Sequence, residues 1–250
     1  MEAEGEIMKK ISSALLAALL LLATVFTGAP AALAAGVSVN ATTVTVYFLN
    51  QEFREKISQP AAYPGSFQLK VNGADKATYR VTAGESATVS STGLVEPLCT
   101  RYYWYGNVGS TAPTPGKTPD RVTESYTAGD STVQVTAGGK TFRVTVHVQS
   151  YAQVYVDSVM KEYIAKNLPA NPTDYNKAET AAKFAAQYEY SANYSSYLSM
   201  VILGGGDCWA STGAVNRMCS LMGLPAWTRN GNKDAGAGSG PVRKRHLLPN

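Results

Sequence analysis

The residues best suited to covalent chemistry form a glycine-rich segment that ends in a cysteine. Three glycines at positions 204–206 are followed by Asp207 and Cys208. The pattern after them predicts a helix from about Cys208 to Met222, which places the thiol in the first turn. There the helix dipole and the free N–H groups favour a thiolate and could stabilise an oxyanion. The glycines would let a substrate backbone approach closely.

Two interpretations of Cys208 are open on these residues alone. Asp207 is a suitable N-cap for the helix, although its negative charge opposes thiolate formation next to it. Cys208 is then either a nucleophile or a buried structural cysteine that follows a flexible loop. We expect Trp209 and Trp227 to pack around the same helix.

The other two cysteines offer no obvious partner for Cys208. On one continuous helix the Cα atoms of Cys208 and Cys219 would lie roughly 16 Å apart. A disulfide tolerates about 7 Å at most, so these two cannot pair. Cys219 stands among Val215, Met218 and Met222, which predicts core packing. Cys99 lies in a different part of the chain.

The sequence has two histidines, which limits the choice of a general base. His147 falls on the polar side of a predicted strand, where we expect a solvated surface histidine. His246 follows Cys208 along the chain and is the candidate partner for it. No acidic residue follows His246 to orient the ring. The candidate catalytic residues are therefore Cys208 and His246.

Residues 151–240 resemble the transglutaminase-like (papain-like) superfamily. Gly206-Asp207-Cys208 matches the Gly-x-Cys nucleophile motif, and Leu221-Met222-Gly223-Leu224-Pro225-Ala226 matches the helix end that follows it. Trp227 stands where the family has arginine, and Arg229 follows. The resemblance implies an α+β fold and cysteine-based acyl transfer, in peptidases, amidases or protein cross-linkers.

The family places a histidine and an aspartate on strands that follow this helix. After the Gly-rich stretch 236–240 the position of that histidine is occupied by Pro241. Residues 241–250 show no strand alternation and include the basic run Arg243-Lys244-Arg245, which we expect to be an exposed tail. We therefore expect the chain to be truncated or frame-shifted near residue 240, so that mainly the helical part of the domain is present.

The first 34 residues have the pattern of a secretory signal peptide. Met8-Lys9-Lys10 is a basic region, residues 14–27 are apolar, and Ala32-Leu33-Ala34 predicts cleavage before Ala35. An uncleaved membrane anchor is the alternative. The pattern predicts a secreted or cell-surface protein that touches the membrane only through this segment.

Residues 35–150 have the period-two pattern of strands. Phe142, Val144, Val146 and Val148 alternate with polar residues after a Gly138-Gly139 turn, which predicts a hairpin. Residues 87–95 and 138–146 resemble bacterial Ig-like repeats, which implies a β-sandwich with a spacer or adhesive role. The aromatic run Tyr102–Tyr105 would either bind a sugar or peptide or hold a long loop against the sandwich.

Helical periodicity begins at Tyr151, and Thr173 is a plausible N-cap for a second helix that continues to about Tyr188. In that second helix we expect Tyr175, Ala178 and Phe184 at apolar positions. The expected organisation is multi-domain: a signal peptide at 1–34, an all-β Ig-like sandwich at 35–150, and an α+β transglutaminase-like domain at 151–250.

Composition excludes several classes of protein. A net charge of +4 with 16% charged residues is too weak for a nucleic-acid binder, and 45% hydrophobic residues exclude a disordered tail. With three cysteines and two histidines the chain offers no metal or cofactor pattern. The expected function is exported cysteine-dependent acyl transfer on a peptide or amide substrate, such as a protein or a peptidoglycan-type peptide. A chain truncated before the family's later strands would be inactive as written. The alternative is a non-catalytic cell-surface or wall-binding protein.

Overall fold

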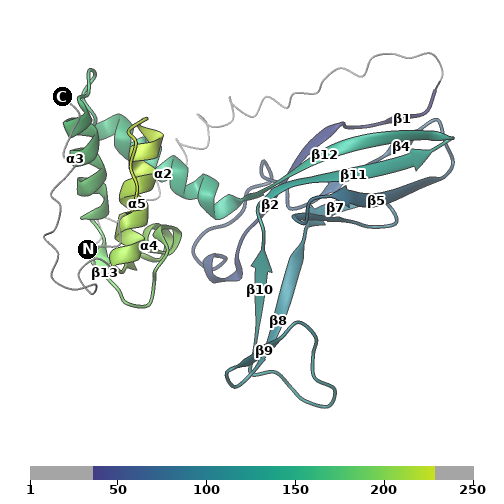
Figure 1. Ribbon diagram of the computed structural model, residues 1–250, viewed down its shortest axis with the longest axis horizontal. Coiled ribbons are helices and arrows are strands. Elements are labelled where there is room, and N and C mark those ends of the chain that lie inside the picture. Colours follow the sequence, from purple (N-terminus) through teal and green to yellow (C-terminus); the bar gives the residue numbers. More distant parts are fainter. Residues whose placement is uncertain (1–35, 229–250) are drawn as a thin grey trace, which may run out of the picture. The chain divides into compact units, whose positions relative to one another are not determined.

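A computed structural model describes residues 36–228 of the chain. Within this range the fold is β-rich and mixed, with strands in several sheets and four α-helices. The described residues form two compact units, the first comprising 36–54 and 58–151 and the second 55–57 and 152–228 (Figure 1). No helix in residues 36–228 has the length and apolarity needed to span a bilayer. The expected signal peptide and His246 lie outside the described residues.

A four-stranded sheet forms the main part of the first unit. Its order is β2 (Thr43–Phe48), β12 (Lys140–Ser150), β11 (Gly129–Ala137) and β5 (Ala77–Ala83). The pairs β11–β12 and β11–β5 are antiparallel, whereas β12 and β2 run parallel. Gly138 and Gly139 join β11 to β12 with φ angles of 54° and 74°, a left-handed conformation that favours glycine. The predicted hairpin is therefore confirmed.

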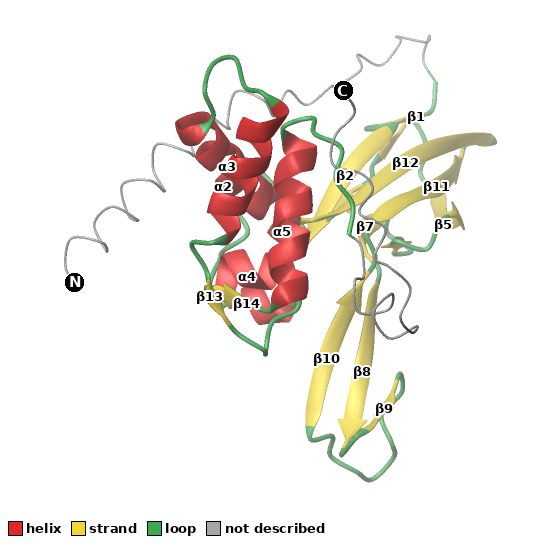
Figure 2. Ribbon diagram, turned by 60° about the vertical axis from the view of Figure 1, so that its left-hand side comes forward, coloured by secondary structure: helices red, strands yellow, loops and turns green. Residues whose placement is uncertain are grey.

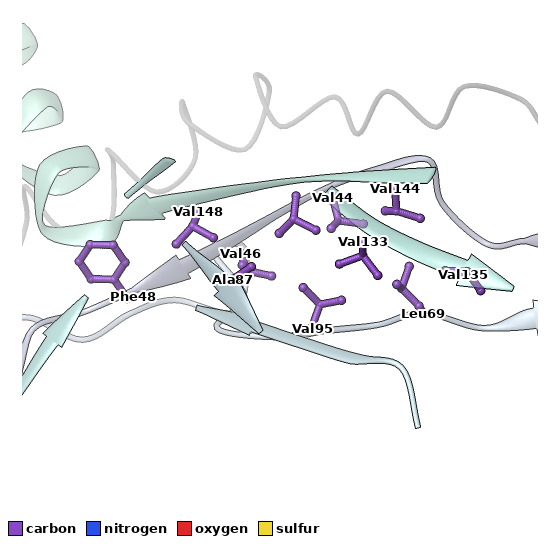
Figure 3. Packing of buried hydrophobic residues seen from close by; sticks show 11 residues of the cluster. Val44, Val46, Phe48, Leu69, Ala87, Val95, Val133, Val135, Val144 and Val148 are labelled. Atoms are coloured by element: carbon purple, nitrogen blue, oxygen red, sulfur yellow. The ribbon is translucent and has the colours of Figure 1, made fainter. Parts of the chain in front are cut away.

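A second, three-stranded sheet packs on the same core. It has the order β3 (Phe67–Gln68), β7 (Leu94–Pro97) and β6 (Ala87–Val89), and β1 (Ser38–Val39) pairs with β4 (Val71–Asn72) nearby. Alternate residues of β2, β11 and β12 point inward and meet Leu69, Ala87 and Val95 (Figure 3). The buried set is Val44, Val46, Phe48, Leu69, Ala87, Val95, Val133, Val135, Val144, Val146 and Val148. Period-two alternation thus gives this unit its core.

Three further strands extend from these sheets as a separate arm. β8 (Cys99–Tyr105), β9 (Val108–Ser110) and β10 (Arg121–Tyr126) pair in the order β10-β8-β9 (Figure 1). None of their residues is buried. Tyr102–Tyr105 therefore belong to a strand and do not hold a loop against the sheets. Trp104 lies under the guanidinium of Arg121, 4.6 Å from the ring centroid.

Polar contacts and a ring stack hold the base of this arm. Arg54, just after the short 3-10 helix η1 (Gln51–Phe53), donates to Glu124 Oε2 at 2.7 Å. The Tyr126 hydroxyl donates to the same oxygen at 3.0 Å, and its ring stacks on Phe48 with centroids 5.0 Å apart. Burial and hydrogen bonds to Cys99 and Glu124 raise the pKa of Tyr126 to about 12. Tyr126 therefore stays protonated as a donor at neutral pH.

The second unit contains the helices. They are α2 (Tyr151–Asn167), α3 (Asp174–Ala185), α4 (Tyr197–Leu203) and α5 (Cys208–Leu221), with the short strands β13 (Glu189–Tyr190) and β14 (Gly205–Gly206). The start of α2 at Tyr151 confirms the predicted change of period. Thr173 caps α3 in a capping box with Asn176, as expected. The shared core consists of Val156, Met160, Ala181, Phe184, Met200, Ala210, Ala214, Met218 and Cys219.

A polar network ties α2, α4 and α5 together. Arg217 Nε donates to Asp157 Oδ1 at 2.7 Å, and a second contact joins Arg217 Nη2 to Asp157 Oδ2. Gln153 Nε2 donates to Asp157 at 2.7 Å, and the Tyr197 hydroxyl donates to Gln153 Oε1. The hydrogen bond to Asp157 raises the pKa of Arg217. This pairing is bidentate, the geometry in which arginine binds a carboxylate most specifically.

The packed face of α3 differs from the expectation. Tyr175 and Ala178 are exposed, and the buried residues are Thr180, Ala181 and Phe184.

We predict that Phe184→Ala lowers the free energy of unfolding by about 3–5 kcal/mol, because it leaves a cavity in the core. Tyr175→Ala, on the same helix but 73% exposed, should change it by no more than about 0.5 kcal/mol. Chemical denaturation of the full chain measures both, and equal effects would contradict this packing.

Candidate active site

Cys208 is the first residue of α5, as the sequence predicts, and its side chain is exposed. Asp207 is the N-cap of the helix. Its Oδ1 accepts from the backbone N–H of Ala210 at 2.9 Å, and its Oδ2 accepts from the Ser195 hydroxyl at 2.7 Å. The Ala210 N–H first, and then Ser195, hold the pKa of Asp207 below its usual range. The predicted capping role is confirmed.

A short parallel strand pair fixes the chain just before Cys208. Gly205 and Gly206 of β14 pair with Glu189 and Tyr190 of β13 (Figure 2). The N–H of Asp207 donates to the carbonyl of Tyr194 at 2.9 Å. Gly205 and Gly206 are buried, while the thiol that follows them is exposed. A buried cysteine after a flexible loop is therefore the wrong interpretation.

The three glycines are explained by the backbone conformation at 204 and by the protein's own packing at 205 and 206. Gly204 ends α4 in the left-handed conformation, with φ 92°. A Cβ on Gly206 would lie 2.6 Å from Ala210 Cβ and 2.9 Å from Met200 Cγ. A Cβ on Gly205 would lie 3.2 Å from the Glu189 carbonyl oxygen. The expectation that these glycines leave room for a substrate backbone is wrong at 205 and 206, because the chain itself fills the space.

Most N–H groups around the start of α5 already have acceptors. The Asp207 side chain accepts a hydrogen bond from the Ala210 N–H and also interacts with the Trp209 N–H. The Asp207 carbonyl accepts a hydrogen bond from the Ser211 N–H. Within the described residues the N–H of Cys208 has no acceptor. An oxyanion formed next to the sulfur would thus find one backbone donor, on Cys208 itself.

Two exposed aromatic side chains belong to the elements that meet near Cys208, namely β13 and α5. Trp209 is 54% exposed and Tyr190, whose Cα pairs with that of Gly206, is 77% exposed. The expectation that Trp209 and Trp227 pack around the helix is wrong, since Trp227 is also 77% exposed. Sequence reasoning missed Tyr190 and Ser195, because only the β13–β14 pairing brings their segment to the start of α5.

Neither histidine is shown to act as a general base for Cys208. His147 lies on β12 in the first unit, with its Nδ1 2.6 Å from Asp130 Oδ1, on the outward side of the sheet. The prediction of a surface histidine is confirmed. His246 lies outside the described residues, so its role as a base stays a prediction. In the described part of the chain, Cys208 Sγ has no hydrogen-bond partner.

The other cysteines occupy different environments. Helix α5 is unbroken from Cys208 to Leu221. Cys219 is 3% exposed and lies in the core shared by the helices of the second unit. Burial raises the pKa of the Cys219 thiol. Cys99 is half-buried at the base of the arm, opposite Tyr126. All three cysteines are free, which confirms that Cys208 and Cys219 do not pair.

No group of three or more His, Cys, Asp or Glu side chains within residues 36–228 could hold a metal ion. No protein-family model matches the chain, and no curated protein matches it. The candidate site therefore stands on the geometry around Cys208 alone.

We predict that iodoacetamide alkylates Cys208 first, because its thiol is exposed whereas Cys99 is half-buried and Cys219 is buried. Cys219 should react only after unfolding, because burial both shields it and raises its pKa. Peptide mass spectrometry at a series of pH values gives the order. Labelling of all three cysteines at the same rate in the folded protein would contradict the exposure of Cys208.

Asp207→Ala should lower the melting temperature, because it removes the cap of α5. Asp207→Ser is the matched control, since serine also caps helices but carries no charge. Folding lowers the pKa of Asp207, so its carboxylate stabilises the folded state at pH values above the pKa that Asp207 has in the unfolded chain. This stabilisation is lost as the pH falls through the lower pKa of the folded state. Thermal melts between neutral and acid pH measure this, and a melting temperature unchanged by Asp207→Ala would contradict the capping role.

Proposed function

We propose that this chain is an exported protein that carries out cysteine-dependent acyl transfer on peptide or amide substrates. The first unit would be a bacterial Ig-like sandwich, and the second the helical part of a transglutaminase-like domain, with secretion or cell-surface display directed by residues 1–34. The observation that supports the proposal most is the exposed thiol of Cys208 at the first position of a 14-residue helix.

The chemistry assigned to Cys208 is a two-step exchange. The thiolate sulfur attacks the substrate carbonyl carbon, the C–N bond breaks, and the amine leaves with a proton. Water or a second amine then attacks the thioester and releases an acid or a new amide, which regenerates the thiol. His246 is the candidate donor of the leaving-group proton. The Cys208 N–H would stabilise the oxyanion in each step.

The residues near Cys208 offer polar and aromatic contacts for a peptide substrate. The carboxylate of Asp207 is held by Ser195 and Ala210, which directs its negative charge to those donors. Tyr190 of β13 and Trp209 of α5 have exposed rings. Such rings contact peptides through apolar area and through a polar edge. A protein or a peptidoglycan-type peptide is the substrate class proposed.

The alternative is a non-catalytic cell-surface or wall-binding protein. The outward side of the four-stranded sheet supports it, because that side is broad, polar and formed by residues with no part in the core. The two functions differ in what the thiol does. Only the first requires an acylated Cys208 as an intermediate.

We predict that p-nitrophenyl acetate acetylates the full chain at Cys208 with a burst of one p-nitrophenolate per protein. Added amine should then accelerate loss of the acetyl group if the thioester is resolved by transfer. Mass spectrometry locates the acetyl group, and absorbance follows the burst. Cys208→Ser should abolish the burst, whereas Cys99→Ser, which alters a thiol of the other unit, should leave it unchanged. Acetylation spread evenly over the cysteines would favour the non-catalytic alternative.

A further inference from the structure

The solvent side of the four-stranded sheet carries a regular polar array. Residues that alternate with the buried valines point outward from β2, β5, β11 and β12. Most of them are threonines: Thr43, Thr45, Thr78, Thr82, Thr132, Thr136, Thr141 and Thr145. The antiparallel and parallel registers align these residues in rows across the strands. The result is a broad face of hydroxyl groups, each of which can donate and accept a hydrogen bond.

One row of this face is cationic. Gln134 of β11 lies between Arg80 of β5 and Arg143 of β12, because it pairs with each of them in the register. Each arginine lies on a strand next to β11, one on each side of it, so their Cα atoms are two strand spacings, or about 10 Å, apart. Both are exposed, and Arg80 donates to Gln134 Oε1 at 3.0 Å. This row is flanked on both sides by rows of threonine.

The charge of the two arginines is not neutralised within the described residues. No ion pair between residues 36 and 228 includes Arg80 or Arg143. The four strands contain one carboxylate, that of Asp130, and it is 2.6 Å from His147 Nδ1. Each guanidinium therefore retains most of its five donors for an external acceptor, and carboxylates and phosphates are the partners it binds in bidentate geometry.

We propose that this face binds an acidic glycan, whose carboxylates are bound by Arg80 and Arg143 and whose hydroxyls are bound by the threonines. The charge supplies the attraction, and the rows of hydroxyls match a ligand that carries many hydroxyls of its own. Nucleic acid fits less well. Of the Phe and Tyr residues in these four strands, Tyr47 is the one that lies outside the core. Its ring packs edge-on against that of Tyr63, with centroids 5.1 Å apart, and offers no free platform for a base. The inference is independent of Cys208.

The test uses the full chain and polygalacturonate as the probe, with dextran as a neutral glycan and polyphosphate as an anion without sugar. We expect binding to polygalacturonate that weakens as salt rises from about 0.1 M to about 1 M, where the screening length falls from about 10 Å to about 3 Å. Dextran should not bind, and polyphosphate should bind more weakly. Equal binding of polyphosphate, or no binding of polygalacturonate, would overturn the proposal.

Two double variants distinguish binding by this face from attraction by the net positive charge of the whole protein. Arg80→Gln with Arg143→Gln should weaken polygalacturonate binding by at least about tenfold, equivalent to about 1.4 kcal/mol. Lys70→Gln with Lys117→Gln removes the same charge from exposed sites outside this face and should change affinity by less than about twofold. An equal loss in the lysine variant would mean that binding is nonspecific.

The hydroxyl groups need a variant of their own. Thr132→Val with Thr145→Val keeps the shape and the strand preference of a cross-strand pair beside the arginine row. It should weaken binding of polygalacturonate and leave that of polyphosphate unchanged, because only the glycan uses the hydroxyls. Unchanged melting temperatures in both arginine and threonine variants exclude unfolding as the cause. Loss of binding to both polymers in the threonine variant would contradict hydroxyl recognition.

Discussion

The close contact of Gly206 with Ala210 and Met200 fixes the start of α5, and with it the position of Cys208. Because a Cβ at 206 would lie 2.6 Å from the Ala210 Cβ, the backbone of β14 packs directly on the first turn of the helix. The Asp207 side chain then turns back to the Ala210 N–H, and Cys208 is left on the solvent side. A larger residue at 206 would displace this whole junction.

The β-sheet unit obeys a different constraint, which is the strict alternation of strand side chains. Inward valines of β11 and β12 form the core, and the residues between them form the polar face. Because the period is two, a one-residue shift of register would exchange the two sets. The core and the row of Arg80, Gln134 and Arg143 are therefore consequences of the same pairing, although one stabilises the fold and the other is free to bind.

Local signals made several features predictable. The start of α5 at Cys208, the capping by Asp207 and Thr173, and the Gly138-Gly139 turn depend on residues close in sequence. The arm, the exposure of Trp209 and the approach of Ser195 to Asp207 depend on contacts between distant segments, so the sequence pattern missed them. The Ig-like and transglutaminase-like assignments stay predictions, as do the export signal and the role of His246.

The sequence by itself determined which residue types stand next to Cys208 and which strand positions are apolar, because both follow from neighbours along the chain. Only the tertiary structure decided that the thiol is exposed and that Met200 and Ala210 occupy the space beside Gly206. It also placed Arg80 of β5 beside Gln134, which is 54 residues away in sequence, so that Gln134 lies between Arg80 and Arg143. The physical reason is that exposure and alignment depend on which strands and helices meet, and these pairings form between segments that local periodicity does not connect.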